Sequence, residues 1–485
     1  PAIEMPEEPR PGAAVAHAYQ MGSTDQKWGF VQFQVNDLSG LTVDKATTSY
    51  DDQIGAGEYV DGKYYTFTLE YDFIMGDGLE PSEYVVWDVA DNFRKESSAA
   101  ATTGRVVDMA FDYINNTMYA LKEINRTDNG AIGLTALNVV DMASGEMTLV
   151  GLPGEIKAVN GNGVTVDEHL VGLASDPSDG QLYAMGEYRQ LYKIDRLTGT
   201  ATPVGERNRI AITNDFQSMA FSAEGKLYQA QMHPDYEYFM EIDIQTGALT
   251  NPVTGEPVVV DSDFTNNAAR FPYDPQLTGL YFEGKELAKS SATAPTGLTA
   301  VVRDGTSNTV DLSWTNPVET YDGGEAQLTA VKVYRFGSAE VLAVLSASAT
   351  SYTDEAAPDG DVTYLVVAET AGHAGFPAWA TVFSGADRLK AVTNLTVELE
   401  GNEAVLTWTA PTETVNGGYS DYENITYVVS RTKGTETVVV DEGLASTNLS
   451  VRLTENGTYT FTVIPVSCGV EGVPATTEPV TLQGV

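Results

Sequence analysis

Residues 169–206 alternate short apolar segments with turn sequences in a regular order. The apolar segments are GLAS, QLYAM, QLYKI and TATPV, and the turns between them include DPSDG and DRLTG. Alternation with a period of two, bounded by Gly, Pro and Asp, is typical of β-strands joined by tight turns. This stretch therefore predicts a small antiparallel sheet of four strands.

The same unit recurs between residues 28 and 284. Strands of the type [Gly/Asn]-x-x-Tyr end at Tyr65, Tyr119, Tyr183, Tyr228 and, in a looser copy, Tyr281. An Asp-x-x-x-Gly turn follows at residues 141–145, 195–199 and 243–247. At 88–92 the glycine is replaced by Asn92, the next residue that tolerates a positive φ. A repeat of about 40–50 residues with this content predicts the blades of a β-propeller.

The two ends of this region complete each other. The strand around Tyr281 has no Asp-x-x-x-Gly turn after it, and the first hairpin, with Asn36 and Gly40, has no tyrosine strand before it. We expect residues 268–284 to supply two strands of one blade and residues 28–46 to supply the other two, which leaves no exposed sheet edge. The fold class is therefore all-β, a propeller of five blades, or six if a loop contains a degenerate blade.

Two copies of a different unit follow the propeller. Trp314 and Trp408 open matching segments in which Pro317/Pro411, Glu319/Glu413, Thr320/Thr414 and Gly323-Gly324/Gly417-Gly418 share an offset of 94 residues. Tyr364 and Tyr459 begin later alternating strands. An early core Trp and a later Tyr are typical of a β-sandwich of about 95 residues. These motifs resemble fibronectin type III domains of secreted bacterial proteins.

These patterns divide the chain into five parts. The expected boundaries are a Pro/Glu-rich tether at 1–25, the propeller at 26–286, a linker at 287–293, and fibronectin type III domains at 294–386 and 389–485. Residues 172–199 resemble the blades of secreted bacterial propellers of the quinoprotein-like and lactonase-like kinds. That resemblance implies blades and does not identify a chemistry, because binding propellers share it.

The composition excludes several classes of protein. The chain has 68 acidic and 27 basic residues and a net charge of −41, which argues against nucleic-acid binding. Cys468 is the only cysteine and there are four histidines, so neither an intrachain disulfide nor a Cys/His zinc cluster is expected. We expect a bacterial protein, extracellular or on the outer cell surface, monomeric and without a membrane span. The tether is compatible with a lipid anchor upstream of residue 1.

Ligand-binding residues are expected in the loops between second and third strands and in the crossings between blades. These segments are residues 70–83, 121–133, 185–190, 230–238, 152–168, 206–215 and 258–267. Aromatic and arginine side chains there suit glycan stacking or protein anchoring. The residues are Tyr71, Phe73, Arg126, Tyr188, Arg189, Arg207, Arg209, His233, Tyr236 and Tyr238. Loops of this length also accumulate such residues without a function, and the sequence leaves this alternative open.

Acidic residues give two further expectations. Asp112, Asp176 and Asp274 each precede a blade tyrosine by seven residues, which indicates turn capping. Asp261 and Asp263 form a weak calcium motif, the one cofactor that the sequence suggests.

The chain contains no GxSxG, HExxH or phosphate-loop motif. We therefore expect a binding or adhesion protein whose propeller face recognises a glycan or a protein, with the fibronectin type III domains as spacers. The first alternative is a polysaccharide hydrolase or lyase that uses inner-strand acids such as Glu58 and Asp108. The second is a purely structural component of a surface complex.

Overall fold

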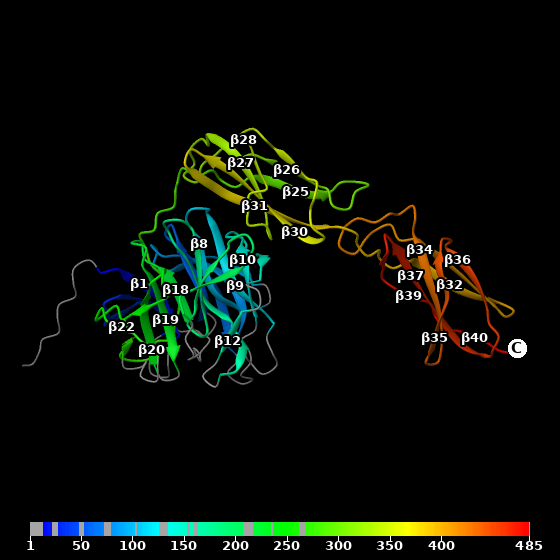
Figure 1. Ribbon diagram of the computed structural model, residues 1–485, viewed down its shortest axis with the longest axis horizontal. Coiled ribbons are helices and arrows are strands. Elements are labelled where there is room, and N and C mark those ends of the chain that lie inside the picture. Colours follow the sequence, from blue (N-terminus) through cyan, green and yellow to red (C-terminus); the bar gives the residue numbers. More distant parts are fainter. Residues whose placement is uncertain are drawn as a thin grey trace, which may run out of the picture. The chain divides into compact units, whose positions relative to one another are not determined.

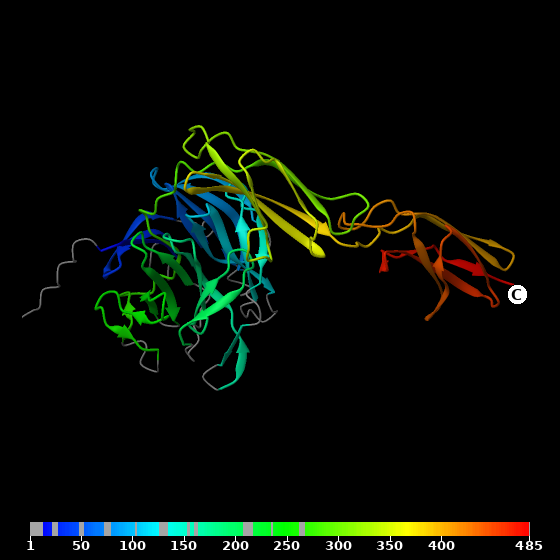
Figure 2. The same ribbon diagram turned by 45° about the horizontal axis from the view of Figure 1, so that its top comes forward.

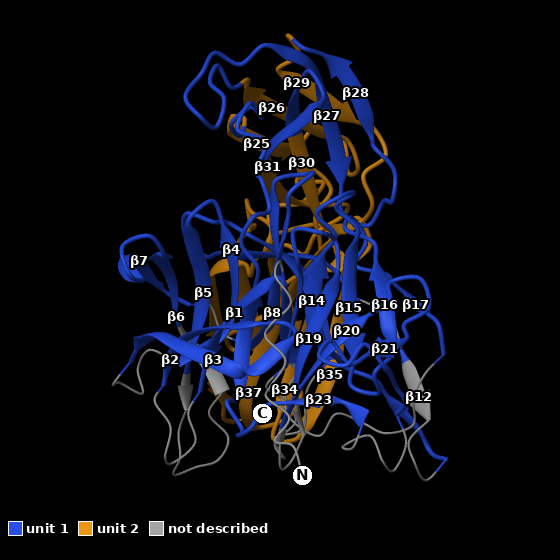
Figure 3. Ribbon diagram, turned by 90° about the vertical axis from the view of Figure 1, so that its left-hand side faces the viewer, with its two compact units in different colours: residues 1–294, 317–347, 367–377 blue, residues 295–316, 348–366, 378–485 orange. Residues whose placement is uncertain are grey.

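The protein is all-β over the residues that the structure describes. The computed structural model describes residues 13–21, 28–47, 53–71, 79–101, 104–125, 134–152, 156–159, 163–206, 217–233, 236–260 and 267–484. Their elements are forty strands, β1 to β40, and no helix (Figure 1). No helix able to span a membrane occurs in these ranges. Contacts divide the chain into unit 1, residues 1–294, 317–347 and 367–377, and unit 2, residues 295–316, 348–366 and 378–485 (Figure 3).

Residues 13–284 of unit 1 contain five antiparallel sheets of four or more strands, coloured from blue to green in Figures 1 and 2. The first has the order β24 (Leu277–Tyr281), β1 (Val15–Gln20), β2 (Gly29–Gln34), β3 (Asp37–Ala46). The second is β4 (Gln53–Val60), β5 (Lys63–Tyr71), β6 (Leu79–Asp88), β7 (Arg94–Ala100), and the third is β8 (Val106–Asp112), β9 (Thr117–Asn125), β10 (Leu134–Val140), β11 (Met147–Gly151).

The fourth sheet is β14 (Leu170–Ser175), β15 (Leu182–Gly186), β16 (Leu191–Ile194), β17 (Ala201–Val204). The fifth is β18 (Gln217–Phe221), β19 (Leu227–His233), β20 (Tyr236–Ile242), β21 (Leu249–Thr250), β22 (Pro257–Val258), and β23 (Ala269–Arg270) also pairs with β20. A separate hairpin joins β12 (Lys157–Val159) and β13 (Thr165–Asp167). The strand pattern of 169–206 predicted from the sequence is thus present as the fourth sheet.

One edge strand of each sheet contacts the edge strand of the next. The contacts run from β24 to β4, β8, β14 and β18, and then from β18 back to β24. These five are called the inner strands below. The Thr278 hydroxyl of β24 donates a hydrogen bond to the Ile54 carbonyl of β4 at 2.5 Å, which joins these two inner strands. The strands β8, β14 and β18 are buried along their whole length, because neighbouring sheets cover both of their faces.

The first sheet, in which both ends of the region pair, is called the closing sheet below. Its strands differ from the expected ones. We expected residues 268–284 to supply two strands, but β24 is its only strand from that segment, and residues 269–270 pair with β20 instead. The other strand is β1, which pairs with both β2 and β24 although it lies in the range expected to be a tether. The sequence VAHAYQ of β1 alternates as a strand should, and Ala16, Ala18 and Tyr19 are buried.

The Asp-x-x-x-Gly turns have the expected geometry. The Asp195 carboxylate accepts hydrogen bonds from the N–H groups of Leu197 and Thr198, both at 2.9 Å, and Gly199 has φ +71°. The turns at Asp141 and Asp243 repeat these contacts. The carboxylate caps the turn, and glycine is needed because its conformation is left-handed.

The turn between β6 and β7 is the variant in which asparagine replaces glycine. Asn92 and the next residue, Phe93, both have φ +53°. The Phe93 ring stacks on Phe30 of the first sheet, with 4.0 Å between ring centroids. This contact between sheets compensates for an unusual backbone conformation at an aromatic residue.

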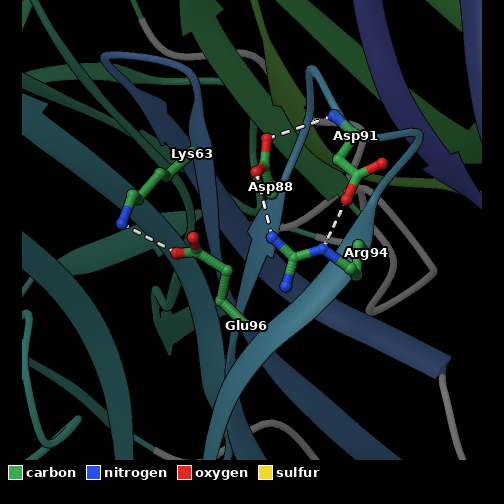
Figure 4. Close-up of polar contacts among 5 residues, drawn as sticks. All are labelled: Lys63, Asp88, Asp91, Arg94 and Glu96. Carbon is green, nitrogen blue, oxygen red and sulfur yellow. Dashed lines mark hydrogen bonds and ion pairs between the residues drawn. The ribbon is translucent and has the colours of Figure 1, made fainter.

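An exposed group of charges surrounds the same turn (Figure 4). Arg94 pairs with Asp91 at 2.5 Å and Asp88 at 3.4 Å, and Lys63 pairs with Glu96 at 2.7 Å. Exposed ion pairs each contribute about 0–1 kcal/mol to stability. The group therefore supports the turn modestly, and its charges are largely neutralised among themselves.

The remaining strands form two pairs of sheets. The first pair is β25 (Thr296–Val302), β26 (Val310–Thr315), β29 (Ser351–Asp354) and β28 (Ala343–Ser346), β27 (Leu328–Arg335), β30 (Gly360–Thr370), β31 (His373–Ser384). The second pair is β32 (Thr393–Glu400), β33 (Glu403–Thr409), β36 (Asn448–Arg452) and β35 (Glu436–Leu444), β34 (Thr426–Lys433), β37 (Gly457–Ser467), β38 (Val470–Glu471). Strands β39 (Ala475–Thr476) and β40 (Val480–Leu482) also pair with β37.

The repeated motifs of this region have structural roles. Trp314 and Trp408 are buried, each 5% exposed, and the Tyr459 hydroxyl donates to the Glu455 carbonyl at 2.6 Å. The second motif, Glu-Thr-x-x-Gly-Gly, receives the incoming chain in both copies. In unit 1, Thr293 N–H donates to Glu319 C=O, and in unit 2, Lys390 N–H donates to Glu413 C=O, both at 3.0 Å.

Candidate functional site

Buried polar side chains gather at the N-terminal ends of the inner strands. Gln53 and Gln217 open β4 and β18, Arg105 directly precedes β8, and Glu168 precedes β14 by two residues. The full set, called the polar end below, is Gln20, Gln53, Arg105, Glu123, Glu168, Arg189, Gln217 and Gln231, each at most 6% exposed. Burial of polar groups is costly without partners, so such a concentration marks either a structural network or a binding site.

Glu168 is held by the turn between β15 and β16. Its carboxylate accepts the Tyr188 N–H at 3.1 Å and a short hydrogen bond from the Tyr192 hydroxyl. A Cβ on Gly186 would lie 2.2 Å from the same carboxylate. The glycine is therefore required for the acid to approach the turn this closely.

Arg189 brings a buried positive charge to the polar end. Its Nε donates to the Gln231 side-chain oxygen at 3.0 Å, and Gln231 donates in turn to Gln229 at 2.6 Å. Burial lowers the pKa of Arg189 to about 10, and the nearby Tyr238 partly opposes that decrease. The guanidinium is therefore still charged at neutral pH, on a residue with φ +54°.

Asp108 occupies the space between three inner strands. Its carboxylate accepts the N–H groups of Leu173 at 2.9 Å and Met219 at 3.0 Å, and the Ser218 hydroxyl at 3.0 Å. Burial raises the pKa of Asp108 well above its ordinary value, and these hydrogen bonds oppose the increase. The residue ties β8 to β14 and β18.

Glu58, the other inner-strand acid, forms a buried ion pair. Lys285 Nζ lies 3.2 Å from its carboxylate, with side chains 2% and 4% exposed. The Tyr59 N–H also donates to this carboxylate at 3.0 Å. Burial raises the pKa of Glu58, and the charge of Lys285 opposes that increase. The pair fastens the chain that leaves β24 to the second sheet.

Only part of the predicted ligand-binding set can be located. Tyr188 and Arg189 lie at the polar end, 8% and 2% exposed. Tyr238 is 0% exposed and belongs to the core between the fourth and fifth sheets, so its ring is not presented to a ligand as expected. Tyr238 pairs with Gln231 in the sheet, so the two side chains lie on the same face. That Tyr188 and Arg189 contact a ligand stays a prediction.

The other predicted residues fall in two groups. Tyr71, His233 and Tyr236 lie in β5, β19 and β20, and their side chains are outside what the structure describes. Phe73, Arg126, Arg207, Arg209, Asp261 and Asp263 lie outside the described residues altogether. Within the described ranges, no group of three or more His, Cys, Asp or Glu is arranged to hold a metal ion.

Sequence reasoning missed Glu168, Gln217 and Gln231. The available signal was a polar residue at a position where the alternation of the strand calls for an apolar one, as in the QAQ segment of β19. Such a residue can be recognised as part of a site only in the tertiary structure, where it lies beside polar residues of other sheets.

A cavity of about 630 Å³ lies elsewhere in unit 1. Its lining includes Tyr113, Tyr334 and His373, together with Lys332 and Glu369, which form an ion pair at 2.7 Å. The pairing neutralises these two charges, and Glu286 also belongs to the lining.

Comparisons with known proteins give a limited result. The family described as a domain of unknown function (DUF4394) matches residues 150–225. The comparison with curated proteins finds no match. A solved segment of two fibronectin type III domains from chicken tenascin is 20% identical, with a TM-score of 0.21, and covers 39% of this chain and 99% of its own. The FN1–FN3 domains of chicken CNTN1 are 13% identical, with a TM-score of 0.20, and cover 39% and 67%.

The strand orders described above agree with the fibronectin type III resemblance. Each pair of sheets combines a three-stranded sheet with a larger one, and each has the buried tryptophan on its second strand. The C-terminal part of the chain therefore has a fibronectin type III-like all-β fold.

Proposed function

We propose that residues 13–284 form a five-bladed β-propeller that acts as the binding module of an extracellular bacterial protein. The support for the fold is the set of five sheets, the contacts that return from β18 to β24, and the closing sheet built from both ends of the region. The quinoprotein-like and lactonase-like resemblance of residues 172–199 fits the same architecture. The fibronectin type III-like domains serve as spacers.

The ligand, a glycan or a protein, binds at the polar end. The observation that carries this proposal is the buried arginine, Arg189, in a network of glutamines beside the ends of the inner strands. Phe73, Arg126, Arg207 and Arg209, which are also expected to contact ligand, lie outside the described residues. A pre-positioned guanidinium favours carboxylate or sulfate groups on a glycan, or acidic side chains on a protein.

The acids weighed for a hydrolase or lyase have structural partners. Asp108 accepts three hydrogen bonds from neighbouring strands, and Glu58 is paired with Lys285. An acid that serves in catalysis must reach its substrate and change its protonation state. These partners favour a structural role for Asp108 and Glu58 over acid–base catalysis, which supports the binding proposal over the enzyme alternative. The experiment described next also tests a purely structural role for the propeller.

The experiment is binding of the full chain to glycan and protein arrays, followed by calorimetry with the best ligand. We expect R189Q to weaken binding by tenfold or more, since a charge-assisted hydrogen bond contributes about 1.5–3 kcal/mol. S313A, at an exposed position of β26, serves as the control and should bind as wild type does. Turnover of a polysaccharide with no binding partner on either array would overturn the proposal.

Localisation and anchoring are tested on cells. Protease treatment of intact bacteria should remove the protein if it is exposed on the outer surface. Mass spectrometry of the native protein should reveal a lipid if an anchor precedes residue 1. Protection from the protease in intact cells would contradict the extracellular location.

A further inference from the structure

Part of the first fibronectin type III-like domain is fastened to the region of five sheets. Strand β27 and the turn from β30 into β31 belong to unit 1 together with that region (Figure 3). Asn116, in the turn between β8 and β9, donates to the Ala374 carbonyl at 2.7 Å and to the Ser291 hydroxyl at 3.2 Å. The Gly337 N–H, two residues after β27, donates to the Leu197 carbonyl at 2.9 Å. These hydrogen bonds fix the two parts of unit 1 against each other.

The cavity of about 630 Å³ lies between these fastened elements. Its walls are the β8–β9 and β14–β15 turns, the segment 286–288, strand β27 and the turn from β30 into β31. Asp112 and Asp176 cap the first two turns as predicted, by accepting backbone N–H groups at 2.9 Å. Binding sites for small molecules are frequent at junctions between domains and enclose about 300–1,000 Å³. The cavity therefore has preformed walls and the size of a ligand site.

The lining combines apolar groups with charged ones. Ile114 and Leu287 are apolar, and Ile114 is 43% exposed. Lys332 and Glu369 form their ion pair at 2.7 Å, and their side chains remain 30% and 23% exposed. An ammonium has three donors and a carboxylate accepts several hydrogen bonds, so one partner does not saturate either group. The pair can therefore bind a ligand that both donates and accepts hydrogen bonds.

Tyr334 adds an aromatic ring to the lining. Its side chain is half-buried, and Arg196 Cζ lies 5.2 Å from the ring centroid. Arg196 lines only a smaller cavity of about 290 Å³, whereas Tyr334 and Asn115 line both cavities. Arg196 thus holds the ring from the side of the smaller cavity. The ring gives the larger cavity a flat apolar surface with a hydroxyl at its edge.

We propose that the larger cavity binds a short neutral glycan. A sugar ring has an apolar face of C–H groups, which lies on the Tyr334 ring in the complex. Two adjacent sugar hydroxyls satisfy the ion pair, one by donating to Glu369 and the other by accepting from Lys332. The apolar side chains of the lining cover the remaining C–H groups.

The charges of the lining favour a neutral ligand over an ionic one. An anionic group beside Lys332 also meets Glu369 and Glu286, and a cationic group beside Glu369 meets Lys332. Like charges brought together at a binding site are costly. The site does not depend on the polar end, whose arginine favours anionic ligands. It gives the first fibronectin type III-like domain a part in binding, beyond that of a spacer.

The test is binding of the full chain to an array that holds neutral oligosaccharides of hexoses and pentoses beside carboxylated and sulfated ones. Calorimetry with the best neutral probe follows. We expect the wild type to bind a neutral probe and Y334A to weaken this binding by about tenfold, whereas Y334F keeps the ring and should retain it. E369Q removes a charged acceptor and should also weaken binding by about tenfold or more.

E340Q is the matched control for E369Q. It removes an exposed carboxylate between β27 and β28 that lies outside the lining of both cavities, and it should bind as wild type does. If Y334A fails to fold, E369Q and the wild type still decide. Absence of binding to every neutral probe, or unchanged binding in both Y334A and E369Q, would overturn the proposal. Binding of only the carboxylated or sulfated probes would also overturn it, while supporting the separate proposal for the polar end.

Discussion

Replacement of Asp108 tests whether the inner strands are held together by a single carboxylate. This side chain is 1% exposed, and it accepts hydrogen bonds from Leu173, Met219 and Ser218 on two other sheets. D108A removes the acceptor and leaves three donors without partners. D108N keeps a carbonyl oxygen for the two backbone N–H groups, and its amide group can donate to the Ser218 hydroxyl.

The expected magnitudes follow from the number of donors. Each buried donor left unsatisfied costs about 1–3 kcal/mol, so the loss of three partners in D108A should destabilise unit 1 by about 3–9 kcal/mol. D108N should cost only about 1–2 kcal/mol, because it resembles the neutral acid. The raised pKa of Asp108 adds a pH dependence. The folded state holds its proton above about pH 4, where the unfolded acid ionises, so wild type should lose stability relative to D108N as pH rises beyond that value.

The measurement is hydrogen exchange of peptides that contain Leu173 and Met219, together with thermal unfolding. Since 1.4 kcal/mol corresponds to a factor of ten, D108A should accelerate exchange of these amides by 100-fold or more. D176A is the matched control, because Asp176 caps a turn of the fourth sheet by accepting the Ser178 N–H at 2.9 Å. It should leave exchange at Met219 unchanged. If D108A melts with wild type and its two amides stay protected, the reasoning is refuted.

Three further substitutions test other buried contacts, each by thermal or denaturant unfolding. K285M should destabilise the protein by about 3–5 kcal/mol because it leaves Glu58 buried and unpaired. The double variant E58Q/K285M should recover much of this loss, and an equal loss in the single and double variants would contradict the reasoning. D387A should cost about 2–3 kcal/mol, since Asp387 accepts the Asn416 N–H at 2.7 Å. Burial raises the pKa of Asp387, but its hydrogen bonds outweigh that effect and lower the pKa overall, so this stabilisation should be lost as pH falls below about 4; an acid transition unchanged in D387A would contradict it. G279A should cost at least about 1–2 kcal/mol of stability, since Gly279 has φ +57° and a Cβ there would lie 2.0 Å from the Tyr64 hydroxyl. If Y64F restores the full stability of G279A, the loss comes from the contact with Tyr64 and not from backbone strain.

Local features were predictable from the sequence because their physics is local. The turn at Asp195–Gly199 depends on a carboxylate two and three residues from the N–H groups that it caps, and on a glycine with positive φ. Trp314 and Trp408 were found as core residues because an apolar ring on an alternating strand has only one face to occupy. The partners of the turn lie within the same few residues, whereas the partner of the Trp408 ring, Tyr427, lies on the facing sheet.

The closing sheet shows where this reasoning ends. Strand β1 pairs with β24, more than 250 positions away in the chain. The missing turn after Tyr281 predicted that the two ends share a sheet, but the segment of β1 was assigned to the tether. The looser repeat at Tyr281 lies in an inner strand, whereas the other four repeat tyrosines lie in the strands that pair with the inner strands. Pairing over such separations is decided by the packing of whole sheets, which a local pattern does not contain.

The sequence by itself determined the all-β class, the repeat, the turns and the two C-terminal modules, because each rests on periodicity and on contacts between near neighbours. The tertiary structure alone decided which polar residues share a site. Arg189 meets Gln231 from another sheet, and Asp108 reaches β14 and β18. Burial and electrostatic coupling depend on distance in space, so these groups acquire their properties only when the sheets have come together.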